Sequence, residues 1–144
     1  MNYVFISAAA LIIILYSPYF LAILAGRPER FEKMLLTEMV SYTAERSRDH
    51  LWRFFLILLL PTTLMEAGYF GLTVAVFDST IFLGISLGFA LFELFHLVRY
   101  VWLFRRYQRG TLEIGELLDW QMERMSCLLF VGHALAGTLI LLIL

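Results

Sequence analysis

Residues 89–99 read FALFELFHLVR, and they place a carboxylate and an imidazole inside an apolar run. The run extends from Thr80 to Phe104, which is long enough to cross a bilayer because a membrane helix needs about 20 apolar residues. Glu93 and His96 are three residues apart, so a helix presents them on one face. Ionisable groups at membrane depth are costly and usually face a polar partner, so this pair predicts a functional site.

The composition of the chain is typical of an integral membrane protein. Of its 144 residues, 61% are hydrophobic and 16% are charged, whereas an ordinary soluble domain has about 45–50% apolar and about 25% charged residues. The net charge of −1 gives no reason to expect a nucleic-acid partner. Cys127 is the only cysteine, which excludes a disulfide framework and a multi-cysteine metal site.

Hydrophobic runs predict four membrane spans, at about residues 4–25, 51–77, 80–104 and 122–144. No Lys or Arg precedes the first span, so we expect a retained anchor rather than a cleaved signal. Between the first two spans, residues 28–48 show the pattern of an amphipathic helix, whose apolar stripe is Phe31, Met34, Leu35, Met39 and Tyr42. The predicted fold is an all-α, integral membrane, antiparallel four-helix bundle with an additional cytoplasmic amphipathic helix. We expect it to form one domain over residues 1–144.

Three local features refine this prediction. Pro18 should kink the first span, and Ser17 is placed to satisfy a backbone group that the kink frees. Gly84 and Gly88 form a small-xxx-small pair, which lets another helix approach closely. Thr111 can cap a helix that runs without interruption through Glu116 and Trp120 into the fourth span.

The distribution of basic residues predicts the orientation. All 11 Lys and Arg lie in or beside two connections, the one between the first two spans and the one between the last two. The positive-inside rule then places these connections in the cytoplasm and both termini outside, in a multi-pass protein of the cytoplasmic (inner) membrane. Trp52, Trp102 and Trp120 lie near the cytoplasmic ends of spans, as residues of an interfacial aromatic belt do.

Polar side chains from all four spans fall at one predicted depth in the lipid bilayer. Tyr16, Glu66 and Glu93 are 12 or 13 residues from the outer ends of their spans, which is about 18–20 Å at a rise of about 1.5 Å per residue. His133 lies at a similar depth, and His96 is one turn closer to the cytoplasm. In a bundle these groups can face one another.

One hypothesis is a transition-metal site formed by Glu66, Glu93, His96 and His133, since two carboxylates and two imidazoles suit iron, zinc or manganese. The Glu-x-x-His spacing resembles one element of the di-iron carboxylate proteins, which carry two such motifs and two further glutamates. Only one motif is present here, so a mononuclear site fits better, or a dinuclear site completed by dimerisation.

Three other hypotheses use the same residues. A b-type haem would be held by His96 and His133. A proton or ion path would use Glu66, Glu93 and His96, with Tyr16 and Arg99 in supporting positions. A buried polar network would only fix the register of the helices.

We therefore expect a small membrane protein that binds a redox metal or haem, as a subunit of a larger electron-transfer assembly or a homo-oligomer. Proton or ion transport is the alternative, and a structural or assembly role is the second alternative. The sequence contains no nucleophile paired with a base and no phosphate-binding glycine loop, so it names no catalytic residue and leaves enzymatic activity open. At the cytoplasmic surface, we expect acidic residues to pair with Arg46, Arg48 and Arg53. These acidic residues are Glu113, Glu116, Asp119 and Glu123.

Overall fold

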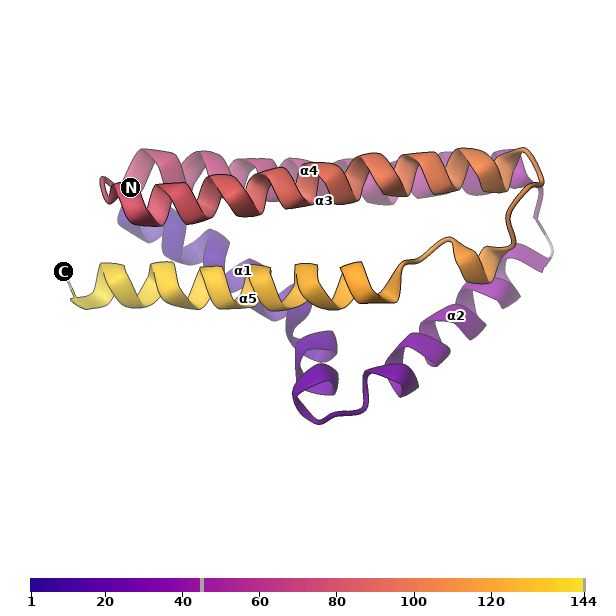
Figure 1. Cartoon of the computed structure of the whole chain (residues 1–144), viewed down its shortest axis with the longest axis horizontal. Helices are drawn as coiled ribbons and strands as arrows, with labels where there is room; N and C mark the ends of the chain where they lie inside the picture. The colour runs from indigo at the N-terminus through magenta and orange to yellow at the C-terminus, as the bar shows by residue number, and fades with distance from the viewer. Residues whose placement is uncertain (45, 144) are drawn as a thin grey trace.

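The computed structural model describes residues 1–44 and 46–143, with the side chains of all of these except residues 48, 49 and 58. These residues form helices and connecting segments, and none of them forms a strand. Figure 1 shows the elements in chain order. They are α1 (Asn2–Leu24), α2 (Pro28–Ala44), α3 (Arg48–Val76), α4 (Thr80–Gln108), the short 3₁₀ helix η1 (Ile114–Glu116) and α5 (Trp120–Ile143).

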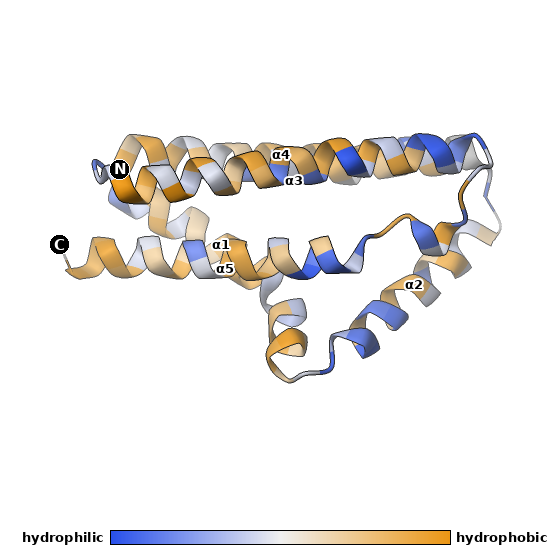
Figure 2. Ribbon diagram, in the orientation of Figure 1, coloured by the Kyte–Doolittle hydropathy of each residue, from blue (hydrophilic) through white to orange (hydrophobic). Residues whose placement is uncertain are grey.

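Four of these helices, α1, α3, α4 and α5, are long and apolar enough to cross a membrane, which confirms the predicted number of spans. Figure 2 shows apolar residues along these helices and polar residues gathered near α2 and the chain around η1. The predicted amphipathic helix ends earlier than expected, at Ala44 rather than residue 48. Residue 144, the predicted end of the fourth span, lies outside the described residues.

The long helices associate as two pairs. α1 packs along α5 and α3 packs along α4, while contacts between the pairs are mainly those of α1 with α3. The start of α1, the end of α5 and the α3–α4 turn lie at one end of the molecule, which we call the terminal end (Figure 1). At the opposite end, the basic end, lie η1, the start of α3 and the last turn of α4, which carries Arg105 and Arg106.

Aromatic residues fill the space between the helices toward the terminal end. The core there contains residues of all four long helices: Phe5, Ala9, Ile12, Tyr69, Phe77, Phe82, Phe89, Phe130 and Ala134. Gly137 allows the closest approach, because a Cβ atom at this position would lie 2.8 Å from Cζ of Phe5. A smaller cluster at the basic end contains Leu51, Phe104, Tyr107 and Leu117.

The predicted small-xxx-small pair on α4 does not contact another helix of the described chain. A Cβ atom at Gly84 or Gly88 would meet no atom within 4 Å in the described structure. Within one chain, close helix packing therefore occurs at Gly137 and not at the glycine pair that the sequence pattern singles out.

The predicted backbone effect of Pro18 is confirmed. Pro18 lies inside α1, and its lack of an N–H leaves the carbonyl of Ile14 without its usual donor four residues on. The hydroxyl of Ser17 donates to this carbonyl at 2.9 Å. Figure 1 shows that α1 changes direction in its second half, so that α1 leaves the bundle and leads into α2.

The predicted continuous helix from Thr111 into the fourth span is wrong. Thr111 lies in an irregular segment, and only Ile114–Glu116 forms a single 3₁₀ turn, in which Glu113 and Glu116 make a capping box. α5 then begins anew at Trp120, because Oδ1 of Asp119 accepts a hydrogen bond from the backbone N–H of Met122 at 3.3 Å. Asp is a favoured N-cap residue, so a new helix start competes with continuation of the earlier turn.

Candidate functional site

A cavity of about 640 Å³ lies between the two helix pairs and extends toward the basic end. All five α-helices and η1 contribute to its walls. The apolar side of α2 forms one wall through Leu35, Met39 and Tyr42, so this part of the predicted stripe faces the other helices. Met34, another member of the stripe, is exposed.

His96 lies between two carboxylates in the wall of this cavity. Its Nε2 atom is 3.2 Å from Oε1 of Glu123 on α5, and its Nδ1 atom is 3.5 Å from Oε2 of Glu93 on α4. Glu93 and His96 share one face of α4 because they are three residues apart, as the sequence predicts. Carboxylates only accept hydrogen bonds when ionised, so an imidazole protonated on both nitrogens satisfies both partners and a neutral ring satisfies one.

Glu66 on α3 has a different partner in the same cavity. The hydroxyl of Tyr16 on α1 donates to Oε1 of Glu66 at 2.8 Å, and both residues line the cavity with Glu93 and His96. Tyr16 is fixed from the other side, since its ring stacks on Phe130 with the centroids 5.2 Å apart. Tyr16, which the sequence predicts in a supporting position, therefore contacts the candidate site residue Glu66 directly.

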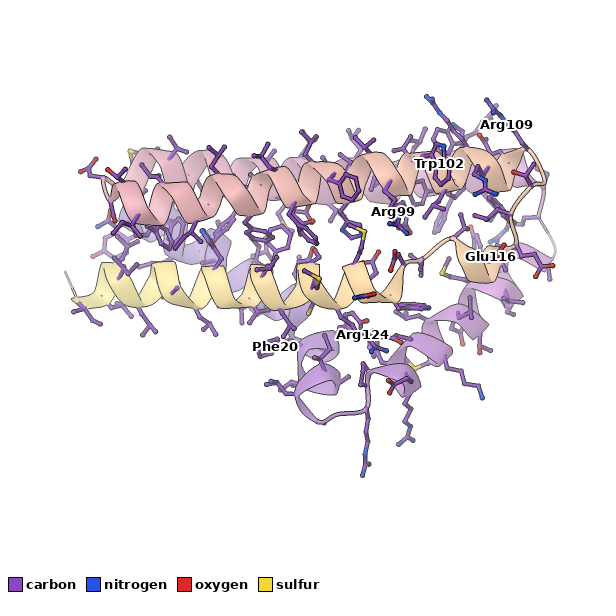
Figure 3. The ribbon with its side chains drawn as sticks, in the orientation of Figure 1. Phe20, Arg99, Trp102, Arg109, Glu116 and Arg124 are labelled. Carbon is purple, nitrogen blue, oxygen red and sulfur yellow. The ribbon has the colours of Figure 1, made fainter. Side chains whose placement is uncertain are left out.

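Arg99 continues the polar series toward the basic end. Its Nη2 atom is 2.6 Å from Oδ2 of Asp119, and Figure 3 shows the side chain between α4 and the start of α5. The acidic residues near α5 thus have partners other than those predicted: Asp119 pairs with Arg99, and Glu123 pairs with His96. Arg46 lies over the ring of Tyr42 instead, while the side chain of Arg48 is outside the described part of the chain.

His133 lies apart from this cavity, in the aromatic core. Its Nδ1 atom is 2.6 Å from the hydroxyl of Tyr69, and its Nε2 atom is 2.7 Å from Oγ of Ser86. The Ser86 hydroxyl donates its own proton to the carbonyl of Phe82 at 2.7 Å. Nε2–H of His133 must then donate to Ser86, and Nδ1 must accept from Tyr69. A neutral imidazole therefore has both of its hydrogen-bonding positions satisfied: the N–H on Nε2 donates, and the lone pair on Nδ1 accepts.

The predicted four-residue set is therefore divided in the structure. Glu66, Glu93 and His96 line one cavity, whereas His133 is not among the residues that line it. In residues 1–44 and 46–143, no group of three or more His, Cys, Asp or Glu side chains is arranged to hold a metal ion. The metal and haem hypotheses stay predictions, and neither gains support from this geometry.

A second polar contact fixes α2 against α5. Nε and Nη2 of Arg124 donate to the two carboxylate oxygens of Glu32, at 2.6 and 2.8 Å, and Figure 3 shows Arg124 between α5 and the start of α2. The hydroxyl of Tyr19 donates to the same carboxylate at 2.6 Å. The hydrogen bonds from Arg124 lower the pKa of Glu32, and that from Tyr19 acts in the same direction.

The sequence does not indicate the pairing of Glu123 with His96, the role of Glu32 or the two partners of His133. Glu32 does not belong to the apolar stripe of α2, yet its side chain is buried. The spacing of Glu32 and Arg124 along the chain gives no indication that they pair. Tyr69 and Ser86 lie in long apolar spans. Single hydroxyl groups are common in such spans, so the sequence does not indicate that these two contact His133.

Comparisons of the chain with protein-family models, with curated proteins and with solved structures found no match.

Proposed function

We propose that the protein is a proton-conducting subunit of a transport system in the cytoplasmic (inner) membrane, in which Glu66, Glu93, His96 and Glu123 carry the proton. The observation that supports this most directly is the position of His96. Its two ring nitrogens face carboxylates on two different helices, inside a cavity that extends from the middle of the spans to the basic end.

The chemistry of an imidazole between two carboxylates suits proton transfer. Histidine can accept a proton on one ring nitrogen and release one from the other. Here a proton taken from Glu123 on α5 can leave toward Glu93 on α4, because each carboxylate is within 3.5 Å of its own ring nitrogen. Intramembrane chains of Asp, Glu and His are the usual components of proton relays.

Access to the proposed relay is one-sided in this arrangement. The cavity reaches the basic end, whereas the aromatic core around Phe82, Phe130 and His133 fills the interior toward the terminal end. Transport across the membrane would require the α1–α5 and α3–α4 pairs to move relative to each other, and this movement would break contacts between the pairs such as those of α1 with α3. Rocking of one bundle against another is the usual form of alternating access.

The proposal includes a membrane topology. We take the single domain to be an antiparallel bundle with the basic end in the cytoplasm and both termini outside, following the positive-inside rule. The exposed Gly84–Gly88 face of α4 is consistent with association with other membrane subunits or with a second copy of the chain.

A redox metal or haem is the competing proposal, and the geometry favours it less. Both ring nitrogens of His133 already have partners, so haem ligation by His96 and His133 would first have to break that unit. A metal held by Glu66, Glu93 and His96 would need these side chains to move together, since the described residues contain no ready group of three ligands. Absorption spectroscopy and elemental analysis of the purified protein would detect either cofactor.

Proton flux into proteoliposomes tests the relay. Liposomes contain the pH-sensitive dye pyranine, and a potassium gradient with valinomycin supplies the driving force. We expect His96→Gln and Glu123→Gln to slow the flux roughly 100-fold, the lower end of what a positioned proton-transfer group contributes. Asp78→Asn is the matched control, because Asp78 is exposed at the terminal end and does not line the cavity. Wild-type flux equal to that of empty liposomes would rule out the proposal.

A further inference from the structure

The cavity combines acidic groups with aromatic walls. Eight of its lining residues are Tyr or Phe, and four are Glu, while His96 is the only basic residue among the described lining residues. From this combination we propose that the cavity binds an amphipathic organic cation, with the charged group near Glu66 and Glu93 and the apolar part toward α2. The inference rests on the proposed transport function and concerns the same site, because Glu66 and Glu93 also belong to the proposed proton relay.

The charge of the lining favours a cation over an anion or a neutral lipid chain. The four glutamates, Glu38, Glu66, Glu93 and Glu123, come from four different helices. The nearest arginine in the polar series, Arg99, does not line the cavity and is paired with Asp119 at 2.6 Å. A cleft lined by charges of one sign and bounded by low-dielectric walls concentrates ligands of the opposite charge.

Glu93 provides an independent indication that a ligand belongs here. Its residue exposure is only 9%, and its Oε1 atom is buried without a hydrogen-bond partner in the described structure. A buried carboxylate oxygen without a partner is costly. Because Glu93 is part of the cavity wall, a cationic group in the cavity would supply the missing interaction.

The aromatic walls suit the rest of such a ligand. Phe55 stacks on Tyr100 with the centroids 4.9 Å apart and on Phe104 at 4.4 Å, and all three rings line the cavity. Aromatic faces attract organic cations through their quadrupole as well as through apolar contact. A volume of about 640 Å³ is within the range of about 300–1,000 Å³ typical of small-molecule sites.

Two probes of matched shape and opposite charge test the inference. Tetraphenylphosphonium and tetraphenylborate differ mainly in the sign of their charge, so apolar fit alone cannot separate them. Equilibrium dialysis against the detergent-purified full chain measures the binding of each probe, with protein-free micelles as the blank. We expect saturable binding of tetraphenylphosphonium and at least about tenfold weaker binding of tetraphenylborate, a difference of about 1.4 kcal/mol. Equal binding of the two probes, or no saturable binding of the cation, would overturn the inference.

Variants then locate the binding site. We expect Glu93→Gln and Glu66→Gln each to weaken cation binding about tenfold, which corresponds to about 1.4 kcal/mol, and Asp78→Asn to leave it unchanged. Size-exclusion chromatography and circular dichroism establish that each variant is folded. If Glu93→Gln does not fold, the affinity of Glu66→Gln and the comparison of the two probes on the wild type still test whether the cavity binds the cation. Folded glutamine variants with wild-type affinity would contradict the inference.

Binding and proton flux are measured separately, so the two proposals can fail separately. Selective cation binding without proton flux would leave the ligand inference standing and remove the relay. Proton flux that depends on His96, without cation binding, would leave the relay standing and remove the ligand inference.

Discussion

Glu32 on α2 and Arg124 on α5 are 92 residues apart in the sequence and are joined by two hydrogen bonds of 2.6 and 2.8 Å. Tyr19 on α1 donates to the same carboxylate, so three helices meet at one acidic side chain. This contact helps to hold α2, which also packs on α1 and η1, and α2 in turn forms one wall of the cavity.

Replacing Arg124 should therefore loosen α2. We expect Arg124→Met to lower the free energy of unfolding by about 1.5–3 kcal/mol, the range for hydrogen bonds to charged groups, because the buried Glu32 loses its main partner. Thermal unfolding in detergent measures the change. Arg30→Met is a matched control on an exposed residue of α2, and an equal loss in both variants would contradict a specific role for the pair.

The same contact predicts a dependence of stability on pH. The pKa of Glu32 is lowered in the folded protein, chiefly by its hydrogen bonds with Arg124. Its stabilising contribution is thus fully present above the ordinary pKa of glutamic acid and is lost as the pH falls through the lower, folded-state pKa. Unfolding curves recorded between neutral and acidic pH should show this loss in the wild type and a smaller one in Glu32→Gln. Parallel curves for the two proteins would refute the linkage.

The histidines of α4 and α5, His96 and His133, should differ in protonation. The hydrogen bonds of His133 are complete with a proton on Nε2 alone, whereas His96 faces a carboxylate from each nitrogen. In ¹⁵N NMR spectra at neutral pH we expect one neutral tautomer for His133 and a doubly protonated ring for His96. Spectra of His50→Gln and His96→Gln assign the signals. A doubly protonated His133 would contradict the inferred direction of its hydrogen bonds.

Gly137 and Gly84 give a matched test of helix packing. In Gly137→Ala the added Cβ would lie 2.8 Å from the buried ring of Phe5, so we expect a loss of about 1–3 kcal/mol from overpacking. Gly84→Ala adds the same atom in open space and should cost little. Unfolding in detergent compares them, and the opposite order would mean that α4 packs through its glycine pair.

The proposed orientation can be tested by cysteine labelling. Cys127 is fully buried, and Cys127→Ala provides a background without cysteine. An impermeant maleimide added to intact cells should label Ser79→Cys at the terminal end and should not label Arg109→Cys at the basic end. The reverse pattern would invert the topology and place the mouth of the cavity outside the cell.

Much of the fold could be predicted because membrane spans depend on composition over about 20 residues. The four spans and the effect of Pro18 follow from such local rules. The interruption before α5 did not, because a single favourable cap at Asp119 competes with continuation of the helix. At this position a new helix start and continuation of the earlier helix compete, and the choice between them cannot be predicted from local sequence preferences.

Prediction of the site succeeded for the contact of Tyr16 with Glu66 and failed for His133. Residue counts placed Glu66 and Tyr16 at one level, where they form a hydrogen bond of 2.8 Å. They also placed His133 at that level, whereas its partners Tyr69 and Ser86 lie three and seven residues closer to the terminal end than Glu66 and Glu93. Rotation of α5 turns His133 toward Tyr69 and Ser86, and this depends on packing of aromatic rings that no single span specifies.

The separation of Glu32 from Arg124 also orders events during synthesis. At about 5–20 residues per second, a ribosome needs roughly 5–20 s to add the 92 residues that separate the two positions. During that interval α2 is completed and begins to leave the ribosome, while its anchor on α5 has not yet been made. The wall that α2 contributes is therefore assembled last. A chain stalled before its final span would contain all the other helices, but its cavity would be incomplete.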